Sequence, residues 1–144
     1  MANLIYSALP HPRRSIVFIP PDLSVADCIN RLIEKNIGAL VVQDKESILG
    51  IVSERDIIKA CLYEGHDLHS TKARDVVYKE VSVLDLFDTV EKAMETITQT
   101  KRRHVLITEK GDLVAILSIG DLLYYLLEDK TRVIEQLENY IHTY

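Results

Sequence analysis

The chain has 144 residues, of which 47% are hydrophobic and 27% are charged, and its formal net charge is −5. This length suits one domain or two small modules that share a core, and an acidic chain without tryptophan is poorly suited to bind nucleic acid through a basic, aromatic surface. No apolar run approaches the roughly 20 residues of a membrane-spanning helix, and Met1–Leu4 lacks the charged and apolar regions of a signal peptide, so we expect a cytoplasmic protein.

The first half of the chain predicts a strand, a helix, a hairpin and a second helix. A β-branched run stops at Pro20, and Ser24 then precedes an apolar stripe with helical spacing that is expected to end near Gly38. Two near-continuous apolar runs follow and predict a buried hairpin. The expected elements are a strand at 16–19, a helix at 25–35, strands at 39–43 and 48–53, and a helix at 54–63.

The second half predicts the same order of elements. These are a strand at 81–83, a helix at 90–100 after Thr89, strands at 104–108 and 113–118, and a helix at 119–128. Residues 129–144 continue with helical spacing and carry one apolar stripe, formed by Val133, Ile134, Leu137 and Ile141. Such a stripe needs a cover, which either the modules or another subunit would supply.

The two halves are copies of one unit, offset by 65 residues without a gap. Six identical pairs lie between residues 25–62 and 90–127, namely Val25/Val90, Lys45/Lys110, Ile51/Ile116, Ser53/Ser118, Asp56/Asp121 and Leu62/Leu127. Two copies are too few for a solenoid. We therefore predict an α/β (α+β) fold of two tandem β-α-β-β-α modules that pack face to face and hold a ligand in their groove. The expected boundaries are module 1 at 1–64, a linker at 65–75, module 2 at 76–130 and a C-terminal helix at 131–144.

Each copy has a Ser-x-x-Asp sequence where a buried strand meets a helix, beginning at Ser53 and at Ser118. A helix N-terminus attracts phosphate, a serine hydroxyl can add a donor, and the carboxylate of Asp56 or Asp121 could accept both hydroxyls of a ribose. These groups together suit a nucleoside phosphate. The same pattern is also a capping box, in which serine and aspartate satisfy free backbone N–H groups without any ligand.

A basic cluster breaks the symmetry of the repeat. Lys101–His104 stands where the first copy has the uncharged segment Asn36–Ala39. In a face-to-face pair this cluster would face the Ser53–Asp56 turn and complete a phosphate site. Alternatively, it is a solvated patch that is favourable at the end of a helix. Arg55 likewise has two interpretations, as a ligand contact or as part of a surface ion pair.

The other reactive residues indicate neither a metal site nor catalysis. Cys28 and Cys61 lie in apolar helical patterns and are expected to be buried thiols. His66 and His69 have a spacing that metal ligands use, but they stand in a polar segment without further ligands, so no metal is predicted. No glycine-rich phosphate loop is present, and Ser53 has no adjacent histidine to activate it, so the chain is not expected to be an enzyme.

These motifs resemble those of the cystathionine-β-synthase (CBS) domain pair, also called the Bateman module. The resemblance covers nearly the whole chain and rests on Gly50–Asp56, Arg103–Ile107 and Ala115–Asp121. The tail Leu137–Ile141 is typical of small stand-alone CBS-pair proteins. The resemblance implies a regulatory module that binds an adenine nucleotide (AMP, ADP, ATP, NAD(H) or S-adenosylmethionine) in the cleft between its two copies.

The resemblance also assigns roles to single residues. In the first site, Asp56 would hold a ribose beside Ser53 and Arg55, Arg103 and His104 would reach the phosphate, and the base would lie near Val81 and Ser82. The mirror site would use Asp121 and Ser118, with Ile16 and Val17 near the base. Its phosphate would face the uncharged Gly38–Ala39, so the Asp56 site is expected to suit a phosphorylated ligand better.

The family further implies a homodimer, and a protein target regulated in trans is possible; no nucleic-acid or membrane partner is expected. The chain departs from the family pattern at Leu40–Val41 and Val105–Leu106, where proline is common, and at Ala115, which replaces a frequent glycine. The alternative function is a structural or assembly dimer whose nucleotide sites are vestigial.

Overall fold

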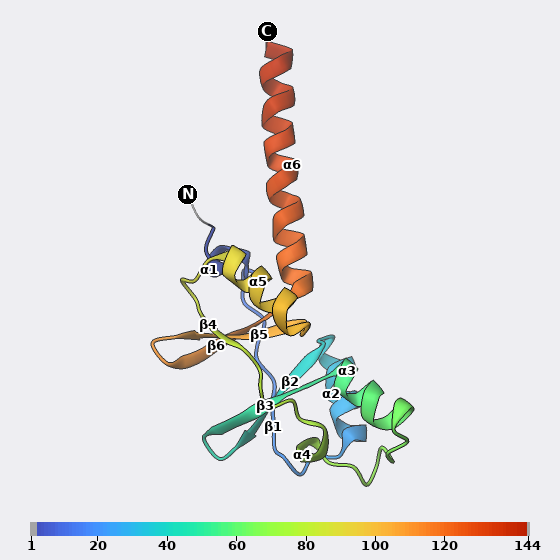
Figure 1. Cartoon of the computed structure of the whole chain (residues 1–144). Helices are drawn as coiled ribbons and strands as arrows, with labels where there is room; N and C mark the ends of the chain where they lie inside the picture. Colours follow the sequence, from blue (N-terminus) through green and yellow to red (C-terminus); the bar gives the residue numbers. More distant parts are fainter. Residues whose placement is uncertain (1–2, 144) are drawn as a thin grey trace. The chain divides into compact units, whose positions relative to one another are not determined.

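The chain forms two compact units (Figure 1). The computed structural model describes residues 3–143, apart from five side chains of the last helix (Arg132, Val133, Tyr140, His142 and Thr143), so Val133 of the predicted stripe lies outside the described side chains. Unit 2 holds residues 15–81. Within the described residues, unit 1 holds 3–14 and 82–143, and is therefore built from two separate pieces of the chain.

Unit 2 contains a three-stranded sheet in the order β1-β2-β3, with β1 parallel and β3 antiparallel to β2. Its elements are β1 (Phe18–Ile19), α2 (Val25–Lys35), β2 (Ala39–Asp44), β3 (Ser47–Ser53), α3 (Glu54–Ile57), a π-helix (Ile58–Tyr63) and α4 (Ala73–Val76). The apolar face of α2, with Val25, Cys28 and Leu32, is buried against Leu40, Val42 and Val52 of the hairpin. This burial is the predicted consequence of the i, i+3, i+7 spacing in α2.

Unit 1 repeats this arrangement with a sheet in the order β4-β5-β6. Its elements are α1 (Ile5–Ala8), β4 (Val83–Asp85), α5 (Val90–Thr100), β5 (His104–Glu109), β6 (Asp112–Ser118) and α6 (Ile119–Thr143). The register of the two hairpins is related by the same 65-residue offset, since Val41 pairs with Ile51 and Leu106 with Ile116. The mixed α/β fold and the duplication are confirmed.

The units divide the chain differently from the predicted modules. The N-terminal lead-in was expected in module 1, but Ile5, Ala8 and Leu9 are buried in the core of unit 1. The Ile5 N–H donates to the Asp88 carbonyl at 2.9 Å, and the Val90 N–H donates to the Asn3 carbonyl at 2.8 Å. Only such long-range pairing decides to which core a short apolar segment belongs.

The expected linker is also part of a folded unit. The Val25 N–H donates to the Thr71 carbonyl at 2.9 Å, and the Ala73 N–H donates to the Leu23 carbonyl at 2.8 Å. Ala73 is fully buried in unit 2. The polar composition of residues 65–75 had predicted a linker, but backbone hydrogen bonds join this segment to the residues at the start of α2.

Several element boundaries differ from those predicted. The strands expected at 16–19 and 81–83 are Phe18–Ile19 and Val83–Asp85. Helix α2 ends at Lys35, as predicted, but its C-terminal cap is Asn36 and not Gly38; the φ of Asn36 is 52°, a left-handed conformation that asparagine tolerates. The helix expected over 54–63 changes to π-type after Ile57.

Helix α6 is one continuous helix over Ile119–Thr143, which joins the helix predicted at 119–128 to the C-terminal helix predicted at 131–144. Figure 1 shows its C-terminal part extending beyond the other elements of unit 1. Ile134, Leu137 and Ile141 of the predicted stripe are accordingly exposed, so the described residues of unit 1 do not cover them. The sequence left two candidates to pack against this stripe, the modules themselves or another subunit, and the structure excludes unit 1.

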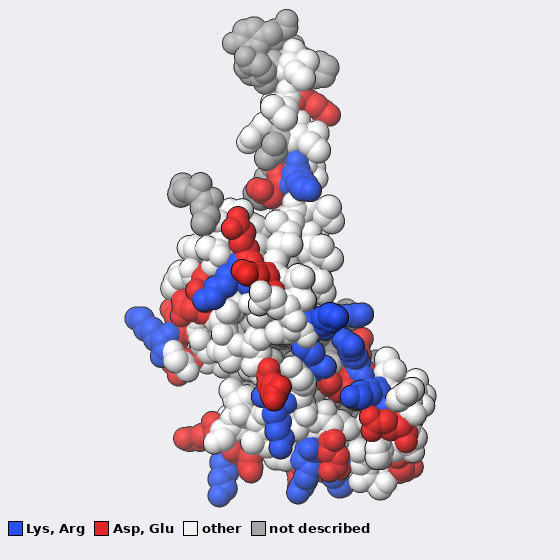
Figure 2. All heavy atoms as spheres, viewed as in Figure 1, with Lys and Arg blue, Asp and Glu red and all other residues white. Residues whose placement is uncertain are grey.

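The described part of the chain contains no helix that is long and apolar enough to cross a membrane. Figure 2 shows acidic and basic side chains interspersed on the face of unit 2 that is in view. A surface that follows a nucleic-acid backbone would instead gather positive charge.

Candidate functional site

The Ser53–Asp56 turn is a complete capping box at the start of α3. The carboxylate Oδ2 of Asp56 accepts the Ser53 N–H at 2.9 Å and the Ser53 hydroxyl at 2.7 Å, and the Asp56 N–H approaches Ser53 Oγ at 3.4 Å. Ser53 is buried, while Asp56 is half-buried. The capping interpretation of the sequence is thus confirmed, and it holds the Asp56 carboxylate in a fixed place at the junction of β3 and α3.

The Ser118–Asp121 turn repeats this geometry at the start of α6. The Ser118 N–H donates to Oδ2 of Asp121 at 3.1 Å, and the Asp121 N–H donates to Ser118 Oγ at 3.1 Å. The Ile119 N–H donates to the Arg103 carbonyl at 2.8 Å and ties the start of β5 to the helix. Both copies therefore place an aspartate carboxylate at the same strand–helix junction.

Arg14 adds a feature that the sequence analysis missed. Its Nη2 lies 2.8 Å from Oδ1 of Asp121, in an ion pair between residues 107 positions apart. The Asp121 side chain is 5% exposed and the Arg14 side chain is 60% exposed. The only sequence signal was an arginine pair, Arg13–Arg14, at the N-terminal end of an acidic chain. Nothing in that pair indicates an aspartate in the other half of the chain as its partner.

A cavity of about 560 Å³ adjoins this ion pair within unit 1. It is lined by Ser7–His11 and Arg14 from the N-terminal piece and by Ser118, Gly120, Asp121, Tyr124, Tyr125 and Glu128 from the β6–α6 region. This volume lies within the range of small-molecule sites, and the lining combines apolar and tyrosine surface with a few charged groups. The cavity could therefore accept a polar ligand of nucleotide size.

In unit 2, the structure requires glycine at the position that corresponds to Ala115. Gly50, its counterpart, has a φ of +151°, and a Cβ built there would lie 2.0 Å from the Tyr78 carbonyl oxygen. The Tyr78 backbone pairs with Ile51 through two hydrogen bonds of 2.8 and 3.0 Å. The chain crosses β3 so closely at this point that only glycine fits, whereas Ala115 is buried within unit 1.

The structure places the basic cluster at the start of β5 in unit 1. Lys101 is the left-handed cap of α5, Arg103 is exposed, and His104 is half-buried and pairs in register with Ser118. The Ser53–Asp56 turn, which the cluster was predicted to face, belongs to unit 2. Their association therefore stays a prediction. Arg55 is an exposed residue of α3.

The residues predicted to contact the base lie beside the first strand of each sheet. The Val17 carbonyl accepts the Val41 N–H at 3.0 Å, and the Ser82 carbonyl accepts the Leu106 N–H at 2.9 Å, again at the 65-residue offset. Ile16, Val17, Val81 and Ser82 are all half-buried. Their side chains are thus partly accessible, as a stacking surface requires.

The structure agrees only in part with the burial expected of the two cysteines. Both thiols are free; Cys28 is buried, but Cys61, in the π-helix, is only half-buried at the core of unit 2. Burial, with the nearby Asp27 charge, raises the pKa of Cys28 to about 11. His66 lies 3.2 Å from the Glu64 carboxylate. The described residues contain no group of three potential metal ligands.

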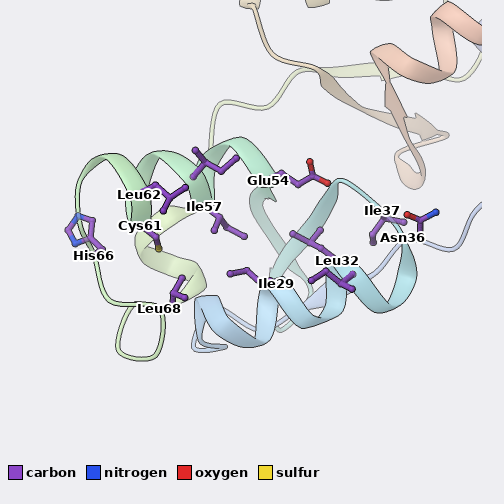
Figure 3. Close-up of a pocket in the computed structure, with 12 residues that line it drawn as sticks. Ile29, Leu32, Asn36, Ile37, Glu54, Ile57, Cys61, Leu62, His66 and Leu68 are labelled. Atoms are coloured by element: carbon purple, nitrogen blue, oxygen red, sulfur yellow. The ribbon is translucent and has the colours of Figure 1, made fainter.

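A second cavity, of about 670 Å³, lies on the helical side of unit 2 (Figure 3). Ile29 and Leu32 of α2 line one side, and Ile57, Cys61 and Leu62 line the other. The lining is mostly apolar, and Glu54 is its only acidic member among the described residues. This surface offers little to a phosphate, so it is a weaker candidate than the Ser-x-x-Asp turns for a nucleotide.

Comparison with known proteins agrees with the fold of the two units. A CBS-domain containing protein from Agrobacterium tumefaciens has a solved structure with 32% sequence identity and a TM-score of 0.79, over 87% of this chain and 94% of that one. The structure of CBSX2 in complex with AMP shares the fold at 24% identity and a TM-score of 0.70, over 89% of this chain and 98% of that one.

Among curated proteins, the mitochondrial CBS domain-containing protein CBSX3 of Arabidopsis thaliana is 26% identical over 83% of this chain. The chain spans 61% of the length of that relative. The CBS domain profile itself matches residues 7–63 and 73–128, one match for each copy of the repeat. The chain therefore belongs to the CBS domain family, with two CBS domains in tandem.

Proposed function

We propose that this CBS-domain pair binds an adenine nucleotide and acts as a regulatory module without catalysis of its own. The observation that carries the proposal is the recurrence of one Ser-x-x-Asp geometry at the strand–helix junction of both units. In each, an aspartate carboxylate is held by the backbone beside a helix N-terminus. Such a carboxylate can accept ribose hydroxyls while the helix start favours the phosphate.

The proposed ligand contacts are those that the resemblance to the CBS domain pair implies. Asp56 and Asp121 accept the ribose hydroxyls, with Ser53 and Ser118 beside them. Arg55, Arg103 and His104 are the cationic candidates for phosphate, and the base lies near Ile16, Val17, Val81 and Ser82. Because CBSX2 was solved with AMP, AMP is the first ligand to test, followed by ATP, NADH and S-adenosylmethionine.

Titration calorimetry of the whole chain with these four ligands tests the proposal. We expect saturable binding of at least one of them, and a loss of about tenfold or more in affinity in Asp56→Ala or Asp121→Ala, because each substitution removes a charged hydrogen-bond acceptor. No binding of any of the four ligands, or unchanged binding in both variants, would contradict the proposal.

Asp75→Ala is the matched control. The Asp75 carboxylate accepts the Lys72 N–H at 2.9 Å, as the aspartate of a capping box does, at the start of α4 and outside the proposed sites. Its loss removes a helix cap of the same kind, so it should lower stability by about 1 kcal/mol and leave nucleotide affinity unchanged. An equal loss of affinity in Asp75→Ala would mean that the other aspartates act through stability alone.

The second candidate is an assembly module, in which the protein forms a homodimer and its nucleotide sites are vestigial. It is favoured by large apolar side chains that are exposed on the helices of each unit: Ile33, Ile58, Leu62 and Tyr63 in unit 2, and Leu123, Tyr124 and Leu127 in unit 1. Exposed apolar surface of this kind often marks an interaction site. A monomer by sedimentation, or nucleotide binding as above, would contradict this alternative.

A further inference from the structure

Both carboxylate oxygens of Asp121 are engaged within unit 1. Oδ2 accepts the Ser118 N–H at 3.1 Å, and Oδ1 lies 2.8 Å from Nη2 of Arg14. A ribose that binds Asp121 as proposed would have to share or replace one of these partners. The backbone N–H is fixed by the helix cap, so the arginine is the partner that can leave.

The exposed fractions of the Arg14 and Asp121 side chains support the conclusion that Arg14 can leave. The Asp121 side chain is 5% exposed, while the Arg14 side chain is 60% exposed. A buried carboxylate without a cation or equivalent hydrogen bonds is costly, so it keeps Arg14 until other donors arrive. The guanidinium, in contrast, already contacts water and can rotate away at small cost.

Arg14 is also tethered at the cavity. The guanidinium of the preceding Arg13 lies 5.6 Å from the centre of the Tyr6 ring, in a cation–π contact. The Tyr6 and His11 rings lie 5.5 Å apart. These contacts hold residues 11–13 against Tyr6 of α1, within unit 1. An Arg14 side chain released from Asp121 therefore stays within reach of the same cavity, which it lines.

We propose that Arg14 is the specificity-determining residue of the Asp121 site, and that it selects nucleotides that carry a phosphate over the corresponding nucleosides. This inference rests on the proposed nucleotide function. A phosphate draws the guanidinium away from Asp121 into a charge-assisted pair, and the freed carboxylate oxygen accepts the ribose hydroxyls. A nucleoside offers no anion to Arg14, so it must break the ion pair without replacing it.

This role also changes the expected difference between the two sites. The repeat comparison predicted that the phosphate at the Asp121 site would face an uncharged segment, Gly38–Ala39. Arg14 supplies the missing positive charge from within unit 1. The Asp121 site is therefore suited to phosphate as well, but binding of the phosphate breaks the Arg14–Asp121 ion pair that the empty site keeps.

The test compares AMP with adenosine by titration calorimetry, in an Asp56→Ala background that leaves only the Asp121 site. Arg14→Gln is compared with Arg14→Lys, which keeps the charge, and with Arg13→Gln, which removes the same charge from the neighbouring residue on Tyr6. Circular dichroism verifies that each variant is folded. We expect Arg14→Gln to weaken AMP and strengthen adenosine, so that the affinity ratio falls by about tenfold or more.

Arg14→Lys should keep most of the preference for AMP, and Arg13→Gln should leave the ratio unchanged. A ratio in Arg14→Gln within twofold of that of the background would overturn the inference, as would an equal change in Arg13→Gln. So would a lack of AMP binding to Asp56→Ala when the unmodified chain binds AMP. If the unmodified chain binds neither AMP nor any other tested nucleotide, the proposed function fails and this inference fails with it.

Discussion

Replacing Gly50 by alanine should destabilise the protein more than any other glycine substitution at a positive φ. At this position the new Cβ would lie 2.0 Å from the Tyr78 carbonyl oxygen and 2.8 Å from its carbon. Both are backbone atoms, so no flexible side chain can move aside. The segment that contains Tyr78 must therefore separate from β3, and the two Ile51–Tyr78 hydrogen bonds of 2.8 and 3.0 Å are lost.

The magnitude follows from two costs. Each lost backbone hydrogen bond is worth about 1 kcal/mol, and an alanine held in a backbone region that is nearly restricted to glycine costs about 1–3 kcal/mol. Gly50→Ala should therefore lower the free energy of unfolding by about 3–5 kcal/mol. Gly65→Ala is the matched control, since Gly65 has a φ of +77° and no atom within 4 Å of the added Cβ. It should cost only about 1–2 kcal/mol.

Urea unfolding followed by circular dichroism measures both variants, and the shift of the midpoint gives the difference in free energy. The reasoning is refuted if Gly50→Ala is as stable as Gly65→Ala, because the close crossing of Tyr78 would then contribute nothing. A crystal structure of Gly50→Ala with the Ile51–Tyr78 pair intact would refute it as well.

Three further predictions concern thiol reactivity, the C-terminal helix and the buried carboxylate. Cys28 is buried whereas Cys61 is partly exposed, so the native protein at pH 8 should react with a thiol reagent much faster at Cys61 than at Cys28, and equal labelling rates would contradict this. Burial raises the pKa of Cys28 from 9.0 to about 11, so the stability of the protein should decrease as the pH rises from about 9 to about 11. Truncation after Lys130 should change the free energy of unfolding by less than about 1 kcal/mol, since Ile134, Leu137 and Ile141 of the apolar stripe are exposed, and a loss of the folded state would show that the C-terminal part of α6 is needed for folding. Asp121→Ala should cost about 2–4 kcal/mol, more than the roughly 1 kcal/mol of Asp75→Ala, because it removes both a helix cap and the partner of Arg14; equal midpoints in urea would refute the role of the ion pair.

The local elements were largely predictable. Helix α2 begins and ends at the predicted residues, and the two hairpins lie within one residue of their expected ranges at either end. Apolar spacing and capping residues act over about four positions, so they can be read directly from the sequence. The change to a π-helix at Ile58 was not predictable on this basis, since the apolar spacing of residues 57–62 is the same as that of an α-helix.

The candidate site was predictable only in part. The two Ser-x-x-Asp turns and their capping hydrogen bonds were expected, because their members are three residues apart. Arg14 was not, and neither was the close approach of Tyr78 to Gly50. In both cases the partners come from distant parts of the chain, and no local pattern indicates which of many polar or glycine residues will meet.

The amino-acid sequence by itself determined the duplication, the order of strands and helices, and the paired aspartate turns, because each depends on residue spacing within one repeat. Only the tertiary structure decided that residues 3–14 belong with the second repeat, and that Asp121 is paired with Arg14, 107 residues away in the chain. Those features depend on which apolar segments share a core. Burial of Ile5 and Leu9 in unit 1 brings the N-terminal piece, and with it Arg14, to the Asp121 carboxylate.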